Sequence, residues 1–260
     1  MRFVRYQIGK EAPKYGWLYE DKIGVLDGDL FQEYRRHQVE IPLASVKLLA
    51  PVVPGKIICV GRNYAEHAKE HNVEVPEIPL LFLKPGSSVI GPGAAVILPP
   101  QSSQIEHEAE LAVVIGKKGR WISPENALDH ILGYCIANDV TARDLQRRDG
   151  QWTRGKGFDT FCPLGPWIET NIDPADALIT CRINDELRQM ASTREMIFTV
   201  PQLIAFISSV MTLEPGDLVL TGTPSGVGKL ESGDTITISV EGIGELTNTV
   251  ISEAIPSSLK

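Results

Sequence analysis

Two glutamates separated by a single residue are the clearest sign of chemistry in this chain. Glu108 and Glu110 open an apolar run that continues to Ile115. In a β-strand, residues i and i+2 point to the same face, so the two side chains would project together. Asp139 ends a second apolar run, Tyr134–Asn138. If the two strands are neighbours, three carboxylates converge, and such a set of oxygen donors suits a hard cation such as Mg²⁺ or Mn²⁺.

The same pair has simpler explanations. A Glu-x-Glu pair alone is most often the solvated face of an edge strand, and the pair by itself does not establish a metal site. The strand is otherwise strongly apolar, which gives two exposed glutamates little reason to be there without a ligand. A further alternative is a non-catalytic protein that binds Ca²⁺ structurally through these carboxylates.

The segment GRNYAEHAKE contains a histidine and a glutamate at helical spacing. If Asn63 caps a helix that carries Tyr64 to His71, then His67 and Glu70 lie on one face of it. A carboxylate beside a histidine orients the ring and raises its basicity, as a general base for water requires. Taken alone, an exposed polar helix with casual ion pairs explains these residues better.

Three further segments present polar side chains where a ligand could meet them. Lys84 ends a predicted strand just before a proline, and Lys156 lies between two glycines in a predicted loop. Glycines let a backbone approach a ligand closely. Thr223 lies in the glycine-rich loop LTGTPSGVG, which lacks the residue order of a phosphate-binding loop and so argues against nucleotide binding.

The segment DVTARDLQ, which begins with Asp139, predicts the start of a helix. Thr141 and Asp144 have the spacing of a capping box, in which each side chain satisfies a backbone group of the first turn. That leaves Arg143 and Gln146 to point into a cleft together with Asp139.

The elements that must position these residues are mostly strands. Residues 1–52 are predicted as a small β-rich N-terminal domain, and residues 53–260 as the larger domain that carries the candidate site. Helices are expected near Asn63, from Ser123-Pro124 and from Pro201. Strands rich in Val, Ile and Leu are predicted at residues 56–60, 80–84, 95–98, 108–115, 133–138, 177–184, 217–220, 235–240 and 246–251.

Strands outnumber helices and do not alternate with them. The pattern therefore favours an α+β, mainly β roll or sandwich over a doubly wound fold.

The composition of the chain limits the classes of partner that can be expected. The 260 residues carry a net charge of -8, which disfavours nucleic acid and leaves anionic substrates dependent on local positive groups. The four cysteines form no CxxC pair and are expected to be reduced, mostly buried thiols. The chain opens without a signal peptide, and no apolar run approaches the ~18 residues of a membrane span. A cytoplasmic protein with no membrane partner is expected.

Five motifs in a fixed order resemble the fumarylacetoacetate hydrolase family over about residues 55–252: GRNYAEHAKE, FLKP, EHEAEL, NDVTARD and LTGTPSGVG. The resemblance implies a mixed β-roll that is usually a homodimer, with the small N-terminal domain of compact bacterial members. It also implies that Glu108, Glu110 and Asp139 bind Mg²⁺ or Mn²⁺, with Ca²⁺ as a substitute.

The resemblance extends to the remaining candidates. His67 and Glu70 match the pair that activates water in hydrolytic members, and Lys156 matches the lysine that holds the substrate or stabilises developing negative charge. Thr223 matches the threonine that grips the substrate carboxylate. Three more positions resemble pocket residues that bind the substrate: Lys84, Arg143 and Gln146.

The resemblance implies a metal-dependent enzyme that cleaves C–C bonds of small 2-oxo or 2,4-dioxo carboxylic acids through a metal-stabilised enolate. The His67 and Glu70 pair resembles the branch of acylpyruvate hydrolases and oxaloacetate decarboxylases, which we rank first. The segment 157–166, GFDTFCPLGP, instead resembles the isomerase/decarboxylase branch of the homoprotocatechuate pathway of aromatic catabolism. A small anionic oxo acid is the expected substrate in either case.

Overall fold

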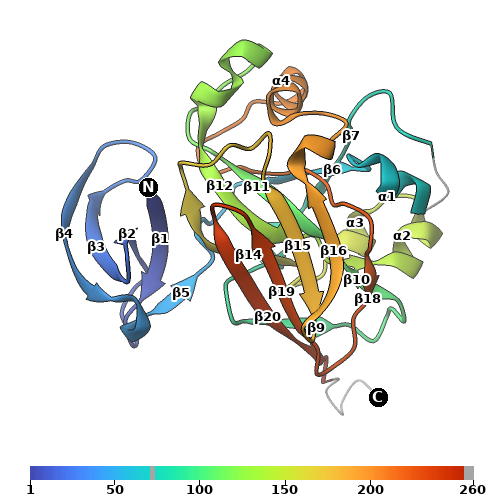
Figure 1. Ribbon diagram of the computed structural model, residues 1–260, viewed down its shortest axis with the longest axis horizontal. Coiled ribbons are helices and arrows are strands. Elements are labelled where there is room, and N and C mark those ends of the chain that lie inside the picture. Colours follow the sequence, from blue (N-terminus) through green and yellow to red (C-terminus); the bar gives the residue numbers. More distant parts are fainter. Residues whose placement is uncertain (71–73, 255–260) are drawn as a thin grey trace.

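The computed structural model describes residues 1–70 and 74–254, which form three β-sheets with a few short helices (Figure 1). The largest sheet has the order β4-β3-β2-β1-β14-β12-β11-β17-β6-β7, with β5 paired to β1 and β8 to β14. Its strands are β1 (Arg2–Gln7), β2 (Lys14–Tyr19), β3 (Lys22–Gly28), β4 (Tyr34–Pro42), β5 (Lys47–Leu49), β6 (Ile57–Gly61), β7 (Leu80–Lys84), β8 (Val89–Ile90), β11 (Ala109–Ile115), β12 (Ile131–Asn138), β14 (Cys162–Glu169) and β17 (Leu218–Leu220).

The second sheet has the order β16-β15-β19-β20-β9, and the third has the order β13-β10-β18. Their strands are β9 (Ala95–Leu98), β15 (Leu178–Ile183), β16 (Glu186–Ser192), β19 (Thr235–Val240), β20 (Gly244–Ser252), β10 (Ile105–His107), β13 (Thr141–Ala142) and β18 (Gly228–Lys229). The helices are α1 (Ala65–Glu70), α2 (Arg143–Asp149), α3 (Thr153–Lys156) and α4 (Val200–Val210), with short 3₁₀ turns η1 (Leu43–Ser45), η2 (Gly86–Ser88), η3 (Pro124–His130) and η4 (Thr193–Glu195).

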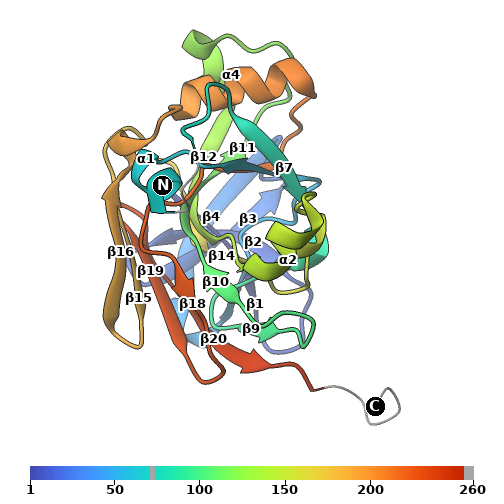
Figure 2. The same cartoon turned by 90° about the vertical axis from the view of Figure 1, so that its right-hand side faces the viewer.

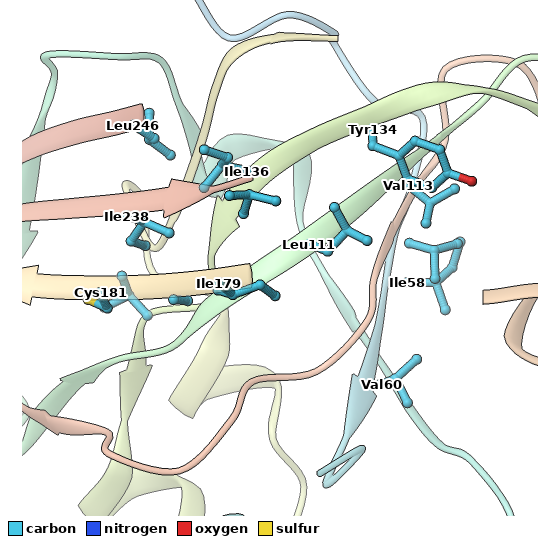
Figure 3. Packing of buried hydrophobic residues seen from close by; sticks show 14 of the residues in the cluster. Ile58, Val60, Leu111, Val113, Tyr134, Ile136, Ile179, Cys181, Ile238 and Leu246 are labelled. Carbon is cyan, nitrogen blue, oxygen red and sulfur yellow. The ribbon is translucent and has the colours of Figure 1, made fainter. Parts of the chain in front are cut away.

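Strand β11 is buried on both faces, which explains its uninterrupted apolar sequence. Leu111 and Val113 belong to the main core between the two larger sheets, and they lie near side chains of β12, β15 and β19 (Figure 3). Ala112 and Val114, on the opposite face, belong to a second core cluster. A fully buried aliphatic side chain of this size contributes roughly 1.5–3 kcal/mol. The strand that begins at the glutamate pair is therefore firmly anchored.

The N-terminal strands continue the large sheet. β1 to β4 form an antiparallel meander, and β1 pairs with β14 through Arg2 opposite Glu169 and Phe3 opposite Ile168. Figure 1 shows this unit on the side of the molecule away from helices α1, α2 and α3. The division into domains at residue 52 stays a prediction.

The predicted fold class, α+β and mainly β, is confirmed. Each of the nine strands predicted beyond residue 52 corresponds to a strand of the structure: β6, β7, β9, β11, β12, β15, β17, β19 and β20. A turn of helix begins at Pro124, although it is the 3₁₀ turn η3. Helix α4 has Pro201 in its first turn and buries Leu203, Ile204 and Ile207 as expected. No helix among the described residues is long and apolar enough to span a membrane.

The predicted role of Asn63 as a helix cap is wrong. Its side-chain amide donates to the carbonyl oxygens of Thr221 (2.7 Å) and Phe198 (3.0 Å), and its carboxamide oxygen accepts from the Phe198 amide (2.7 Å). Asn63 therefore ties α1 to the glycine-rich loop. Helix α1 spans Ala65–Glu70, and the predicted end at His71 lies outside the described residues.

The predicted capping box of α2 is also absent. The Thr141 hydroxyl donates to the Asp139 carbonyl (2.9 Å), and Asp144 instead accepts a hydrogen bond from the Ser102 hydroxyl (2.6 Å). Both residues thus fix the chain around the candidate site. The loop predicted around Lys156 is the short helix α3, and a Cβ at Gly155 would lie 2.9 Å from Cβ of Gln146.

Candidate active site

The register between β11 and β12 brings the three acidic side chains together. Ala109 pairs with Asn138, and the Asp139 amide donates to the Glu108 carbonyl (2.9 Å). One carboxylate oxygen from each of Glu108, Glu110 and Asp139 lies within 4.8 Å of the others, and all three side chains are buried. The convergence expected from the sequence is therefore present, and burial excludes the solvated edge strand.

Two buried lysines hold this acidic cluster. Lys156 Nζ donates to Glu108 Oε2 and to Asp139 Oδ2, each at 2.7 Å. Lys84 Nζ donates to Asp139 Oδ1 (2.6 Å) and to the Val140 carbonyl (3.2 Å). The Lys156 ammonium thus bridges two of the three carboxylates, and Asp139 lies between two ammonium groups.

Arg143 neutralises the cluster from another direction. Its guanidinium donates to Glu108 Oε1 (2.6 Å), to Glu106 Oε2 (2.8 Å) and to Gln146 Oε1 (2.9 Å). Glu106, the first residue of the EHEAEL motif, was not among the predicted site residues, yet it shares Arg143 with Glu108. Because Gln146 accepts through its oxygen, its amide nitrogen is the end that remains to donate.

The charges around Glu108 and Glu110 shift the pKa values of the two side chains in opposite directions. Burial and the carboxylates of Asp139 and Glu108 raise the pKa of Glu110 well above its usual value. Burial also acts to raise the pKa of Glu108, but the cations of Lys156 and Arg143 outweigh it and hold that pKa well below the usual range. The surroundings therefore favour the ionised carboxylate at Glu108 and the protonated carboxyl group at Glu110.

The glycine-rich loop after β17 closes the Glu110 side. The Gly222 amide donates to Glu110 Oε2 (2.7 Å). The Thr223 hydroxyl donates to the Ala109 carbonyl (2.9 Å), between the two glutamates. Gly222 has a φ of 96°, where a side chain is strained, so glycine is required for this approach.

Gln189 on β16 connects this loop to the acidic strand, and no motif or spacing in the sequence pointed to this residue. Its amide nitrogen donates to Thr223 Oγ1 and to the Pro224 carbonyl, each at 2.8 Å. Its oxygen accepts from the Ala109 amide (3.1 Å) and lies 3.0 Å from His107 Nδ1. Because a carboxamide oxygen only accepts, Nδ1 of His107 carries the proton. One buried side chain thus fixes both Thr223 and the backbone between the two glutamates.

Helix α1 places the histidine and glutamate pair beside the same loop. His67 Nδ1 lies 3.1 Å from Glu70 Oε2, and Glu70 Oε1 accepts from the Gly226 amide (3.1 Å). A carboxylate partner on Nδ1 makes Nε2 the basic nitrogen of the ring. His67 is buried, with its side chain 7% exposed, and it lines the cavity.

A cavity of about 350 Å³ opens over the acidic cluster. It is lined by Val60, Gly61, Arg62, His67, Phe82, Glu108, Glu110, Asp139, Arg143, Gln146, Arg147, Gly150, Trp152, Lys156 and Thr223. Figure 2 views the face where α1 and α2, which supply His67 and Arg143, come forward. The wall also contains residues that were not among the predicted site residues, including Arg62, Phe82, Arg147 and Trp152.

Lys84 differs from expectation. Predicted as a pocket residue, it is not among the residues that line the cavity, and its side chain is fully buried against Asp139. The physical reason is its place at the end of β7, where the ammonium meets the acidic cluster and not the open space. Lys84 therefore holds a carboxylate of the cluster, and its role in substrate binding stays a prediction.

The donor set fits a divalent cation. Three buried carboxylates with oxygens within 4.8 Å of one another can converge on one hard ion, and hard ions of this kind take oxygen ligands. Glu108, Glu110 and Asp139 would hold it. An incoming ion competes with the Lys156 ammonium for the oxygens of Glu108 and Asp139.

Comparison with known proteins shows which family the chain belongs to. The model of the fumarylacetoacetate (FAA) hydrolase C-terminal domain matches residues 56–251, and the model of the Rv2993c-like N-terminal domain matches residues 1–51. The chain is 47% identical to the mitochondrial oxaloacetate tautomerase of Rattus norvegicus over 81% of this chain and 71% of that protein.

Two solved structures are similar over nearly the whole chain. The 2-hydroxyhepta-2,4-diene-1,7-dioate isomerase from Mycobacterium marinum has 42% identity and a TM-score of 0.90, over 98% of this chain and 100% of that one. The maleylpyruvate hydrolase from Sphingobium sp. SYK-6, solved with manganese (II) ion and pyruvate, has 34% identity and a TM-score of 0.81 over the same shares.

The mixed β fold, with three buried carboxylates in the wall of a cavity, is the kind of arrangement in which an enzyme can bind a divalent cation. The chain belongs to the fumarylacetoacetate hydrolase family, whose members are hydrolases, isomerases or decarboxylases.

Proposed function

We propose that this protein is a Mg²⁺- or Mn²⁺-dependent enzyme that cleaves C–C bonds of small 2-oxo or 2,4-dioxo carboxylic acids, by acylpyruvate hydrolysis or oxaloacetate decarboxylation. The observation that carries the proposal is the buried triad of Glu108, Glu110 and Asp139 in the wall of a cavity that is also lined by His67, whose ring is paired with Glu70. When bound by the triad, the ion supplies Lewis-acid polarisation of the substrate carboxylate and 2-oxo oxygen.

His67 is the residue that moves a proton in this proposal. With Nδ1 hydrogen-bonded to Glu70, Nε2 can take a proton from a water that attacks the distal carbonyl of an acylpyruvate. Glu70 stabilises the imidazolium that results, and its other oxygen remains on the Gly226 amide. Decarboxylation requires no attacking water and therefore makes no such demand on His67.

Lys156 stabilises negative charge in the same proposal. Burial acts to lower the pKa of Lys156, but the carboxylates of Asp139 and Glu108 outweigh burial and raise it, so the ammonium stays charged. A preorganised cation in a site shielded from water stabilises an oxyanion strongly. Arg143 and Gln146 also line the cavity and would orient the acid head of the substrate.

Thr223 can bind a substrate carboxylate only if its hydroxyl group rotates. Its hydroxyl proton lies on the Ala109 carbonyl, so donation to a substrate carboxylate requires the hydroxyl to rotate away from that oxygen. The amide of Gln189 continues to donate to Thr223 Oγ1 in either position.

An isomerase or tautomerase is the second candidate. Relatives named oxaloacetate tautomerase and 2-hydroxyhepta-2,4-diene-1,7-dioate isomerase support it. Such reactions need only a proton moved between carbon and oxygen, which the same His67–Glu70 pair can carry out. A cytoplasmic homodimer acting on a small anionic oxo acid completes the proposal.

Metal-stripped protein would be offered oxaloacetate and acetylpyruvate, with and without Mn²⁺ or Mg²⁺, and pyruvate would be measured. Pyruvate that requires both metal and protein supports the proposal, and the better substrate selects decarboxylase or hydrolase. Since free Mn²⁺ can decarboxylate oxaloacetate, the matched control is the Glu110→Gln variant with the same metal. Tight metal binding without pyruvate from either substrate favours the isomerase.

A His67→Ala variant separates the reactions. Loss of acetylpyruvate hydrolysis with retained oxaloacetate decarboxylation is expected, because only hydrolysis needs the activated water. Equal loss of both would contradict this role for His67.

A further inference from the structure

Two cations of the cavity wall, Arg62 and Arg147, have no charged partner among residues 1–70 and 74–254, but Arg147 donates a hydrogen bond to the Gln104 side chain. Lys156 and Arg143 each contact two carboxylates. Arg62 also lines the cavity and is half-buried, yet across residues 1–70 and 74–254 it makes no ion pair and no side-chain hydrogen bond. Its one contact of note is with the ring of Trp152, where the guanidinium carbon lies 5.9 Å from the centroid.

An aromatic strip leads from the acidic cluster to Arg62. Lys156 Nζ lies 5.0 Å from the centroid of Phe82, and Phe82 packs edge-to-face on Trp152 with centroids 5.1 Å apart. Trp152 in turn contacts Arg62. The wall of the cavity therefore runs from a charged end at Lys156, along two apolar rings, to a second cation.

The backbone holds Arg62 in an unfavourable conformation. Its φ is 61°, in the left-handed region, where a residue with a side chain is strained. At the preceding residue, Gly61, a Cβ would lie 2.9 Å from both Trp152 Cζ3 and Leu80 Cδ2. The indole thus packs against the end of β6, directly beside Arg62. Strain of this kind is maintained only where surrounding packing fixes it, and it concentrates at binding sites.

The charge of the wall indicates the ligand. The cavity is lined by four cations (Arg62, Arg143, Arg147 and Lys156) and three carboxylates. Behind this wall, Glu106 on Arg143 adds one negative charge and Lys84 on Asp139 adds one positive charge. The net charge is therefore +1, and a divalent ion raises it to +3. A doubly charged anion offsets more of this positive charge than a monocarboxylate does.

We propose that Arg62, with the face of Trp152, forms a subsite for a second carboxylate at the end of the substrate remote from its 2-oxo acid head. The chain between the two acid groups would lie along Phe82 and Trp152. The inference rests on the proposed function, since it assumes that the acid head lies at the triad. It selects dicarboxylic 2,4-dioxo acids over their methyl-ended equivalents.

The test uses a matched pair of substrates, 2,4-dioxoheptanedioate and 2,4-dioxoheptanoate, which differ only in a terminal carboxylate against a methyl group. The Mn²⁺-loaded wild type and Arg62→Gln variant would be compared by kcat/KM for each. We expect the wild type to favour the dioate and the variant to reduce that preference about 30-fold, mainly through KM, as loss of a charge-assisted hydrogen bond implies. Arg182→Gln, on an exposed strand position outside the cavity, is the control and should leave the preference unchanged.

The outcomes separate this inference from the proposed function. A preference that Arg62→Gln leaves within threefold of the wild type, or an equal loss on both substrates, overturns the subsite. A preference lost in Arg147→Gln instead also overturns it, because the second carboxylate then lies at Arg147. If the wild type cleaves neither compound, calorimetry on the Mn²⁺-loaded protein decides. Tighter binding of the dioate that depends on Arg62 upholds the subsite while the proposed reaction fails, and equal binding of both compounds overturns it.

Discussion

The two sides of the acidic cluster differ in how their charge is balanced. On one side, Glu108 contacts Lys156 and Arg143, which hold its pKa low. On the other side, Glu110 receives one hydrogen bond from the Gly222 amide and faces other carboxylates, and its pKa is raised. Two glutamates that are equivalent in the sequence therefore have different tasks. The surroundings favour an anion at Glu108 and a neutral carboxyl group at Glu110, so we expect Glu110 to ionise on metal binding.

The largest expected effect comes from removing the cation that the first side depends on. Lys156→Met takes away the ammonium that bridges Glu108 and Asp139. We expect kcat to fall by about 10²–10³-fold, because a buried charge that stabilises an oxyanion is lost. Mn²⁺ should bind more tightly, because a competing cation is gone. Calorimetric titration and steady-state kinetics check both, with the exposed Lys229→Met as the control. Unchanged kcat would contradict the role of Lys156.

The second prediction concerns Glu110, on the other side of the acidic cluster. Glu110→Gln should weaken Mn²⁺ binding about 100-fold, because a charged ligand is lost. It should also raise the melting temperature of the metal-free protein, by about 3 °C for about 1 kcal/mol. A carboxyl group whose pKa is raised on folding binds more protons in the folded state, so its contribution to stability falls as pH rises above the unfolded value of 4.5.

The gain in melting temperature should therefore grow as pH increases above about 4.5. Melting curves of wild type and variant across pH measure this directly. A Glu110→Gln variant that is less stable than the metal-free wild type at neutral pH would show that Glu110 is stabilised as an anion, and that the two sides do not differ as described.

A smaller effect on metal binding is expected at Gln189, which joins the acidic strand to the glycine-rich loop. Gln189→Met keeps the approximate volume of the side chain but removes the hydrogen bonds to Thr223, Pro224 and Ala109. Mn²⁺ affinity should fall about 10- to 30-fold, as is typical when a group that orients metal ligands is removed. Met190→Gln, at the adjacent exposed position of β16, is the matched control. Equal affinity in both variants would mean that the strand alone fixes the two glutamates.

The smallest effect is the dependence of metal binding on pH. Because Glu110 must lose a proton to become a ligand, binding releases protons and affinity should rise with pH, by less than tenfold per unit. Titrations of Mn²⁺ at several pH values measure the slope. In Glu110→Gln the slope should flatten, since the proton that is displaced is absent. A slope of the opposite sign would contradict the raised pKa.

The sequence predicted the apolar strands well and the polar ones poorly. β11 and β12 were evident because both of their faces are buried, so every residue contributed to the signal. β16 was missed because its buried positions include Gln189 and Ser192, and polar residues in alternation do not resemble a strand. β14 was missed because Pro163, Gly165 and Pro166 indicated a loop.

The candidate site follows the same division. Carboxylates at a spacing of two, on adjacent strands, can be brought together by reasoning from the pleat alone. The contacts of Lys84 and Gln189 depend on how β7 and β16 pack against distant parts of the chain, which no local pattern records. For the same reason, the capping roles given to Asn63 and Thr141 were wrong. Their side chains satisfy backbone groups of the site and not of a helix.

The position of β16 at the edge of its sheet affects how the protein loses activity on heating. An edge strand has one hydrogen-bonded neighbour and therefore separates at a lower free energy than the interior of a sheet. Gln189 would leave with it, and Thr223 and Ala109 would lose their common support. The protein should then lose activity at a lower temperature than the one at which it melts. The highest temperature at which it is active would therefore depend on this one strand and not on the core.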